Sequence, residues 1–363
     1  MNSDKIYQQA LRLEPLTTEE ALFIYERAPL EELMLIADML RRKHVPGNTV
    51  TWQIDRNVNI TNVCISGCKF CNFHCRLSQK DRSFITTIDE YLQKIGETLR
   101  LGGDQLLLQG GLHPNLDINY YETLFKELKK HYPVIKLHAL GPPEIVHIAK
   151  ISRLDIRTTL QRLIAAGLDS LPGAGAEILD TAVRKKVSPA KCSAEEWLAV
   201  MAEAHKLNMA TSATMMYGHV ETLLQRIEHL IKLRDLQAKK PENHYGFIAF
   251  IPWIFCSTGT QLEKEGVISR YTPFEYLRII AISRIILHNI TNIQASWLTV
   301  GKEVAQICLH GGANDLGSIM IEENVVSSAG ASYRMDADEM IDTIKKAGFV
   351  PQLRDQKYRF RNL

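Results

Sequence analysis

From about residue 57 onward, short apolar segments alternate with amphipathic helical stretches. Eight segments have strand character, and most are separated by stretches with apolar residues three or four positions apart. Strands that alternate with helices predict an α/β fold with parallel strands, and eight such units over about 260 residues favour a closed, TIM-like (β/α)8 barrel over an open sheet. The expected strands are 57–63, 104–110, 134–140, 168–173, 210–218, 246–253, 293–300 and 315–321. The expected helices include 88–101, 119–131, 194–208, 220–237, 273–289 and 335–347.

The chain has further segments on both sides of this repeating part. Residues 4–45 carry apolar residues at helical spacing, and Thr17 with Glu20 makes a capping box, so an N-terminal helical extension is expected. Residues 348–363 are basic and interrupted by proline, which indicates a tail. We therefore predict three parts: a helical extension over 1–48, the barrel over 49–330, and a C-terminal helix and tail over 331–363.

Composition narrows the classes of function. Of the 363 residues 45% are hydrophobic, enough for a large core, and the formal net charge is only +2. So weak a charge does not suggest a nucleic-acid or membrane-surface partner. The N-terminus has no apolar signal region, and no apolar run approaches the ~20 residues that span a bilayer. A cytoplasmic protein is expected, and its oligomeric state, including a homodimer, stays open.

Four of the seven cysteines crowd into residues 64–75, which in a cytosolic chain indicates metal binding or redox chemistry. Cys64, Cys68 and Cys71 form a C-x3-C-x2-C run that directly follows the first expected strand. Three thiolates on one loop can ligate three irons of a [4Fe–4S] cluster, which leaves the fourth iron free. A free iron can chelate the amine and carboxylate of S-adenosylmethionine (SAM), whose reductive cleavage gives a 5′-deoxyadenosyl radical.

Two alternatives use Cys75, which lies four residues after Cys71. Four thiolates can hold a structural zinc ion, although such sites usually pair two separate C-x2-C knuckles. Cys75 can also complete the ligand set of a cluster that only transfers electrons, although a barrel of this size exceeds what electron transfer needs. The cysteine run followed by Gly110-Gly111 after the second strand favours the open cluster.

Polar and glycine-rich segments follow the expected strands at the end where barrel enzymes place their chemistry. Gly110 and Gly111 allow backbone groups to approach a cofactor closely, as the SAM amino group requires. Phe70, between two of the cysteines, is a candidate to pack near the adenine, and packing within the loop is the alternative.

Three segments carry a resemblance to a known family: NITNVCISGCKFCNF, LLLQGGLHPNLDINYYETLFKELK and HALGPPEI. They resemble the radical SAM enzymes of futalosine-type menaquinone synthesis and their deazaflavin-cofactor relatives, and the resemblance extends from about residue 15 to residue 358. It implies a [4Fe–4S] cluster, SAM, a nucleoside-derived substrate and a one-electron donor such as flavodoxin or ferredoxin. The implied reaction is a radical cyclisation of dehypoxanthine futalosine. Aminofutalosine synthesis and hydroxyphenyl transfer in deazaflavin-cofactor synthesis are the enzymatic alternatives.

The resemblance also implies cofactor contacts. Glu177 is expected to bind the ribose hydroxyls of SAM, and Arg184 its carboxylate. Two charges seven residues apart would share one face of a helix, and an ion pair at the surface is the alternative.

Other polar residues near the strand ends are candidates for catalysis or substrate binding. His113, Asp315 and Glu322 are the candidates for acid–base chemistry, because histidine titrates near neutrality and carboxylates at strand ends suit proton removal. A structural role for the histidine and helix capping for the glutamates are the alternatives. The candidate substrate contacts are His138, His219, Ser296, Thr299 and Glu323.

Overall fold

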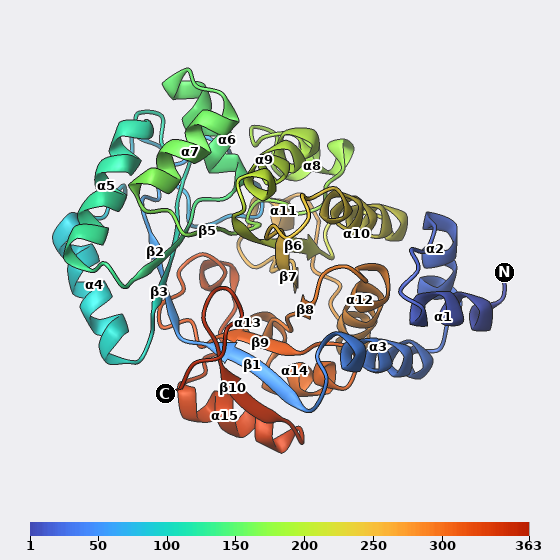
Figure 1. The fold of residues 1–363 in the computed structure, drawn as a ribbon. Coiled ribbons are helices and arrows are strands. Elements are labelled where there is room, and N and C mark those ends of the chain that lie inside the picture. Colours follow the sequence, from blue (N-terminus) through green and yellow to red (C-terminus); the bar gives the residue numbers. More distant parts are fainter. Residues whose placement is uncertain (363) are drawn as a thin grey trace.

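The computed structural model describes residues 1–362, and its central feature is a barrel of parallel strands surrounded by helices (Figure 1). Seven strands pair in the order β2-β3-β4-β5-β6-β7-β8, all in parallel. Each crossover between these strands contains at least one helix, so the apolar face of that helix covers the outside of the barrel. The predicted α/β barrel is therefore confirmed.

The elements have the following bounds. The strands are β1 (Thr49–Gln53), β2 (Asp55–Asn59), β3 (Gln105–Gln109), β4 (Lys136–Ala139), β5 (Ser170–Leu171), β6 (Ala210–Tyr217), β7 (Phe247–Ile254), β8 (Asn292–Ile293), β9 (Asp315–Ser318) and β10 (Val350–Leu353). The helices are α1 (Ser3–Leu11), α2 (Thr18–Arg27), α3 (Leu30–His44), α4 (Ile88–Arg100), α5 (Ile118–His131), α6 (Pro142–Ser152), α7 (Ile156–Ala166), α8 (Thr181–Val187), α9 (Ala194–Lys206), α10 (Leu223–Ala238), α11 (Gln261–Lys264), α12 (Pro273–Ile286), α13 (Trp297–Val300), α14 (Lys302–Leu309) and α15 (Ala337–Lys346).

A second sheet of three strands, in the order β10-β1-β9, closes the barrel. Strand β1 runs into β2 after a single intervening residue, and β9 lies beside it. On its other side β9 meets β8 through a parallel bridge between Gln294 and Asp315. Strand β9 thus occupies the eighth position of the barrel with only short backbone pairings to its neighbours. Side-chain interactions add to these pairings.

The main side-chain interaction that joins these strands is a buried ion pair between Asp315 on β9 and Arg354, which follows β10. The guanidinium donates to both carboxylate oxygens, at 2.6 Å and 3.0 Å, and the hydroxyl of Thr51 donates to the same carboxylate at 2.5 Å. This one group therefore links β9, β1 and the segment after β10. Figure 1 shows that the three strands lie side by side.

Two expectations about elements are wrong. The strand expected over 293–300 ends at Ile293, and Trp297–Val300 is a short helix; the Trp297 indole donates to the Ser318 carbonyl at 3.1 Å. The segment expected to be only a tail contains β10, whose pairing with β1 from Val350 to Leu353 was not predicted. The four residues of β10 include a proline, so their alternation of apolar and polar residues was too weak a signal to predict a strand. The division of the chain into three domains stays a prediction.

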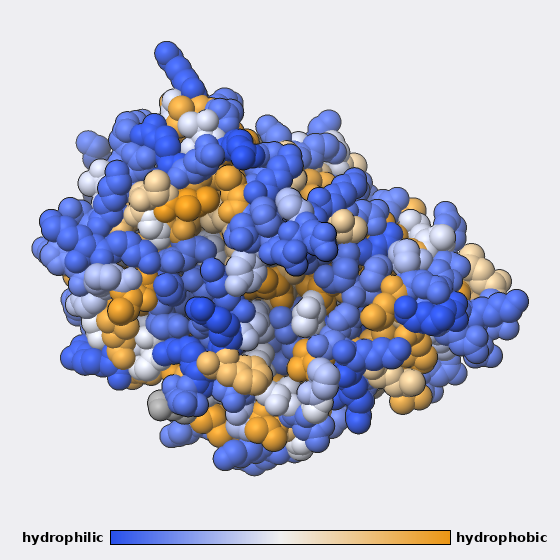
Figure 2. Space-filling view, viewed as in Figure 1, coloured by the Kyte–Doolittle hydropathy of each residue, from blue (hydrophilic) through white to orange (hydrophobic). Residues whose placement is uncertain are grey.

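The N-terminal helices pack on the outside of the barrel beside α10 and α12 (Figure 1). The predicted capping box is confirmed, since the Thr17 side chain accepts from the Glu20 amide and Glu20 bonds back to Thr17. Hydrophilic residues dominate the face seen in Figure 2, and its apolar residues lie in scattered groups. Over residues 1–362, every helix is too short or too polar to cross a membrane.

We predict that Asp315→Asn lowers the free energy of unfolding by about 3–5 kcal/mol, because it leaves the Arg354 charge buried without its partner. Denaturant titration of the purified protein measures the change. The matched control is Asp342→Asn, which removes an exposed carboxylate paired with Lys346 at 2.7 Å and should leave the denaturation midpoint unchanged. Equal midpoints for Asp315→Asn and the wild type would contradict a role of this pair in closing the barrel.

Candidate active site

The barrel encloses a cavity of about 410 Å³ that opens toward the carboxyl ends of its strands. The loop after β2 brings Cys64, Cys68 and Cys71 to the wall of this cavity. Parallel strands all end at the same rim, so loops that are distant in sequence meet there. The cavity is therefore where the cysteine loop and the other strand-end segments can act together.

The three thiols lie among hydrogen-bond donors. The Ser66 hydroxyl lies 2.9 Å from the Cys64 sulfur and 3.3 Å from the Cys68 sulfur, and the Leu112 amide donates to the Cys64 sulfur at 3.2 Å. Burial raises the pKa of Cys68 to about 11. Burial also opposes ionisation of Cys71, but its hydrogen bonding with His74 holds the pKa of that thiol below its ordinary value.

Cys75 is separate from this group. Its backbone pairs with the start of the loop, since its amide donates to Asn62 at 2.9 Å and its carbonyl accepts from the Cys64 amide at 3.0 Å. Its side chain is 1% exposed, and it does not line the cavity, whereas the other three cysteines of the loop do. Cys75 therefore closes the loop as a buried apolar residue, and its position is unfavourable for a fourth ligand.

The donor set fits a three-cysteine [4Fe–4S] cluster better than a single ion. In residues 1–362 no three His, Cys, Asp or Glu side chains are placed to hold one metal ion together. A zinc ion requires its ligands to converge on one point. In a cubane cluster each thiolate binds its own iron, so three separated thiols on one wall suffice.

Gly111 allows the cysteine loop to lie against the end of β3. A Cβ at this position would lie 2.1 Å from the Val63 carbonyl oxygen and 2.8 Å from the Cys64 Cβ. The Gly111 amide also donates to Thr61 at 2.8 Å. Gly110 and Gly111 both line the cavity as expected, but the close approach that requires glycine is to the cysteine loop.

A buried charged group lies beside the cysteines. Glu177 pairs with Lys191 at 2.7 Å and with Arg184 at 3.3 Å, and its own backbone has a φ of +43°, which is strained for a residue other than glycine. Burial opposes ionisation of Glu177, but the two cations hold its pKa below the ordinary value. The Lys191 ammonium lies 5.2 Å from the centre of the Phe70 ring. Glu177, Lys191 and Phe70 all line the cavity.

Five predicted site residues do not line the cavity. The ring of His113 accepts from the Asn115 amide at 3.1 Å, and His219 pairs with Glu221 at 3.0 Å. Asp315 pairs with Arg354, and Glu322 pairs with Lys94 at 2.5 Å, so the fold gives each carboxylate a cation as its partner. The structure thus places these four residues outside the cavity lining, and their roles in catalysis or substrate binding stay predictions.

Arg184 is the fifth residue outside the cavity lining, and its role toward SAM stays a prediction. Its guanidinium donates to the carbonyls of Gly175, Ala176 and Cys192 at 2.6–3.0 Å, which fixes the loop that carries Glu177. The shared helical face was wrong, because α8 begins only at Thr181. Lys191, which the sequence analysis missed, takes the place in the cavity that was expected for Arg184.

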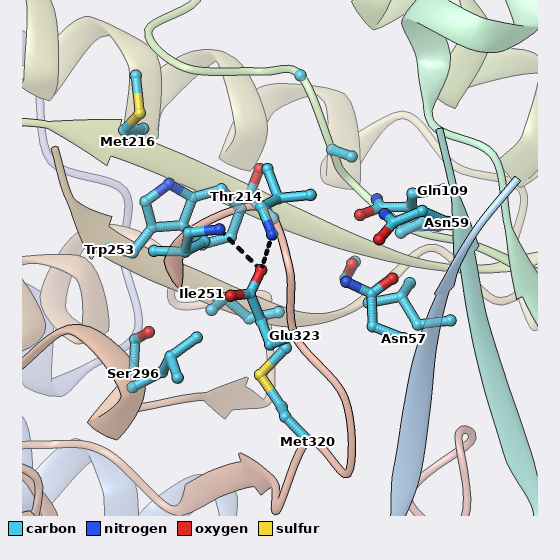
Figure 3. Close-up of a pocket in the computed structure, with 18 of the residues that line it drawn as sticks. Asn57, Asn59, Gln109, Thr214, Met216, Ile251, Trp253, Ser296, Met320 and Glu323 are labelled. Atoms are coloured by element: carbon cyan, nitrogen blue, oxygen red, sulfur yellow. Dashed lines mark hydrogen bonds between the residues drawn. The ribbon is translucent and has the colours of Figure 1, made fainter. Parts of the chain in front are cut away.

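The other predicted contacts do line the cavity, and their roles stay predictions. His138 is hydrogen-bonded to Ser170 at 2.7 Å, and Thr299 donates to the Ser296 carbonyl at 3.1 Å. Glu323 lines the cavity and also accepts from the amides of Val325, Val326 and Ser327 at 2.7–2.8 Å; Figure 3 draws two of these bonds. Its carboxylate therefore holds the backbone of the segment that follows it, and its role toward a substrate stays a prediction.

Two groups of cavity residues were missed. One lies after β10 and comprises Arg354, Gln356 and Tyr358, which the expected tail concealed. The other consists of polar side chains on the first strands of the barrel: Asp55, Asn57, Asn59, Gln105 and Gln109. Their signal was present, because polar residues at every second position of a strand that should be buried on both faces indicate a wet interior.

The fold resembles that of two solved structures over nearly the whole chain. Methylornithine synthase (PylB) matches with a TM-score of 0.71 at 20% identity, covering 97% of this chain and 98% of that one. The hydrogenase maturase HydG matches with a TM-score of 0.75 at 15% identity, covering 98% of this chain and 76% of that one. At these identities the likeness shows the fold alone.

Sequence comparison identifies the family. Residues 58–233 match the radical SAM superfamily, and residues 244–363 match the CofH/MqnC C-terminal region. The cyclic dehypoxanthine futalosine synthase of Streptomyces coelicolor is 46% identical, covering 94% of this chain and 85% of that protein. The 5-amino-6-(D-ribitylamino)uracil–L-tyrosine 4-hydroxyphenyl transferase of Archaeoglobus fulgidus is 40% identical, covering 90% and 93%.

The barrel and its three-cysteine loop define a radical SAM enzyme, whose cofactors are a [4Fe–4S] cluster and SAM. Within that superfamily, the chain belongs to the CofH/MqnC family.

We predict that Cys75→Ala retains the cluster, whereas Cys64→Ala, Cys68→Ala or Cys71→Ala loses it, because only these three thiols face the cavity among the cysteines of the loop. Iron content and the electron paramagnetic resonance signal after anaerobic reconstitution measure the difference. Loss of the cluster from a folded Cys75→Ala protein would show that Cys75 is a ligand.

Gly111→Ala should displace the cysteine loop, since the added methyl group overlaps the Val63 carbonyl. We expect the free energy of unfolding to fall by about 1–3 kcal/mol and the iron content to fall with it. Gly96→Ala is the matched control, because its methyl group in helix α4 meets the flexible Tyr132 side chain at 3.2 Å. The prediction fails if both variants bind iron as well as the wild type.

Proposed function

We propose that this enzyme cyclises dehypoxanthine futalosine to cyclic dehypoxanthine futalosine, a step of menaquinone synthesis. The observation that carries the proposal is the 46% identity to a synthase of that name over 94% of the chain, in a family whose fold and cysteine loop this structure contains. The cavity is also of a size that small-molecule sites have. We further propose a cytoplasmic enzyme that receives single electrons from a flavodoxin or ferredoxin.

When bound, the cluster and SAM supply the 5′-deoxyadenosyl radical that removes a hydrogen atom from C4′ of the substrate's ribose. Cys64, Cys68 and Cys71 would hold the cluster, and Glu177, Lys191 and Phe70 would hold SAM beside it. Because Lys191 keeps its charge next to Glu177, it can bind the carboxylate of SAM while the glutamate accepts from ribose hydroxyls.

The proposed cyclisation joins the sugar carbon to the attached benzoate ring, and the ring must then lose one proton and one electron to become aromatic again. The three cysteines would hold the oxidised cluster, which would accept the electron. Asp55 and His138 are the groups of the inner barrel wall that can take up the proton. Burial raises the pKa of Asp55 above its ordinary value and lowers the pKa of His138 to about 3. We assign the proton to Asp55, whose carboxylate lines the cavity on β2 and accepts a hydrogen bond from Gln105.

Incubation with SAM, a one-electron reductant and dehypoxanthine futalosine under anaerobic conditions should give the cyclised product together with 5′-deoxyadenosine, detected by mass spectrometry. The Cys68→Ala variant is the control and should give neither. Enolpyruvyl benzoate, or 5-amino-6-(D-ribitylamino)uracil with tyrosine, should give only background deoxyadenosine. A hydroxyphenylated product from the last pair would assign the chain to the transferase activity named for its archaeal relatives instead.

A further inference from the structure

The cavity has two unlike walls. Strands β2 and β3 pair in a register that puts Asn59 beside Gln109 and Asp55 beside Gln105, and these side chains face inward together with Asn57. Strands β6 and β7 form the opposite wall, where the pairs Thr214–Ile251 and Met216–Trp253 face inward. Figure 3 shows Asn57, Asn59 and Gln109 across the cavity from Ile251 and Trp253. We call the first group, Asn57, Asn59, Gln105 and Gln109, the amide wall.

The amide wall contains polar atoms that lack partners in residues 1–362. These atoms are the Asn57 side-chain oxygen, the Asn59 side-chain nitrogen and the Gln105 side-chain oxygen. The three residues are only 3–4% exposed, so leaving these groups unbonded costs about 1–3 kcal/mol each. A buried polar surface of this kind indicates a ligand that makes the missing hydrogen bonds.

Neighbouring side chains fix which atom of two of these amides is free. The Gln105 nitrogen donates to the Asp55 carboxylate at 3.0 Å, so its oxygen remains as an acceptor. The Asn59 oxygen accepts from the Asn324 side chain at 3.2 Å, so its nitrogen remains as a donor. The wall therefore offers both acceptors and a donor along two adjacent strands.

A hydroxyl group both donates and accepts, so a row of hydroxyls matches this mixed pattern, whereas a carboxylate only accepts and an ammonium only donates. The opposite wall, with Ile251, Met216 and Trp253, suits a flat apolar ring. The proposed substrate has one part of each kind, a ribose and a benzoate ring.

We infer that the amide wall binds the sugar hydroxyls of the substrate, while the β6–β7 wall packs against its aromatic ring. This inference rests on the proposed function and adds the orientation of the substrate to it. Asn57, Asn59 and Gln105 are then specificity-determining residues, because a ligand without the hydroxyls would leave their buried atoms unpaired. The geometry distinguishes them from Glu177 and Lys191, which form a separate ion-paired group.

The test compares the dissociation constants of dehypoxanthine futalosine and its 2′,3′-dideoxy analogue, measured calorimetrically on the reconstituted protein with SAM present. The wild type should bind the dideoxy analogue about 10- to 100-fold more weakly, in line with the cost of unpaired buried groups. In Asn57→Leu or Asn59→Leu the parent compound should weaken by at least about 5-fold, and the preference for it over the analogue should shrink by the same factor.

Trp253→Leu is the control, because it changes the opposite wall and leaves the amide wall intact. It should weaken parent and analogue by the same factor and keep their ratio. Equal affinities of the wild type for both compounds would overturn the inference, even if every variant failed to fold. A loss of SAM affinity in Asn57→Leu with an unchanged ratio would also overturn it, since the wall would then bind the cofactor.

The turnover assay tests the proposed function separately from this inference. If the proposed function is wrong, the wild type forms no cyclised product from the parent compound in that assay. Failure of this inference leaves turnover intact and abolishes only the preference for the sugar hydroxyls.

Discussion

The closure of eight short parallel strands into a ring is the constraint on which the rest of this structure depends. Closure sends every strand's carboxyl end to one rim, which brings the loop after β2, the glycines after β3 and the loop of Glu177 into one cavity. The eighth position is held by few backbone bonds, so the buried pair of Asp315 and Arg354 carries much of the closure. Asp315, a candidate for catalysis by its place in the sequence, thus joins strands of the barrel in this structure.

Contacts with the barrel position the cysteine loop and its three thiols. Gly111 lets the loop approach β3, Cys75 closes it from behind, and Ser66 and the Leu112 amide face the sulfurs. These contacts place three thiols on the cavity wall and keep the fourth away from it. The cluster's open iron, which the radical chemistry of this superfamily requires, follows from that division.

The other side chains that line the cavity form three groups. Lys191 and Glu177 form a charged corner next to the cysteines, amides line β2 and β3, and apolar groups line β6 and β7. Asp55 connects two of these groups, since it orients Gln105 and is the proton acceptor that we propose. Substrate orientation and proton removal would therefore depend on the same strand, β2.

The sequence by itself determined the barrel class and predicted the cluster cysteines, because periodicity and short spacings are local and survive without coordinates. It indicated the family through the resemblance of longer segments. It also indicated Glu177 and Gly111 correctly as cavity residues. Only the tertiary structure decided which polar residues face inward. Asp315, His113 and Arg184 are satisfied by partners brought to them by the fold, whereas Lys191 and Arg354 enter the cavity from segments without a local motif. Side-chain partners 39 residues apart, as for Arg354 and Asp315, are set by chain closure, and no window of sequence contains that information.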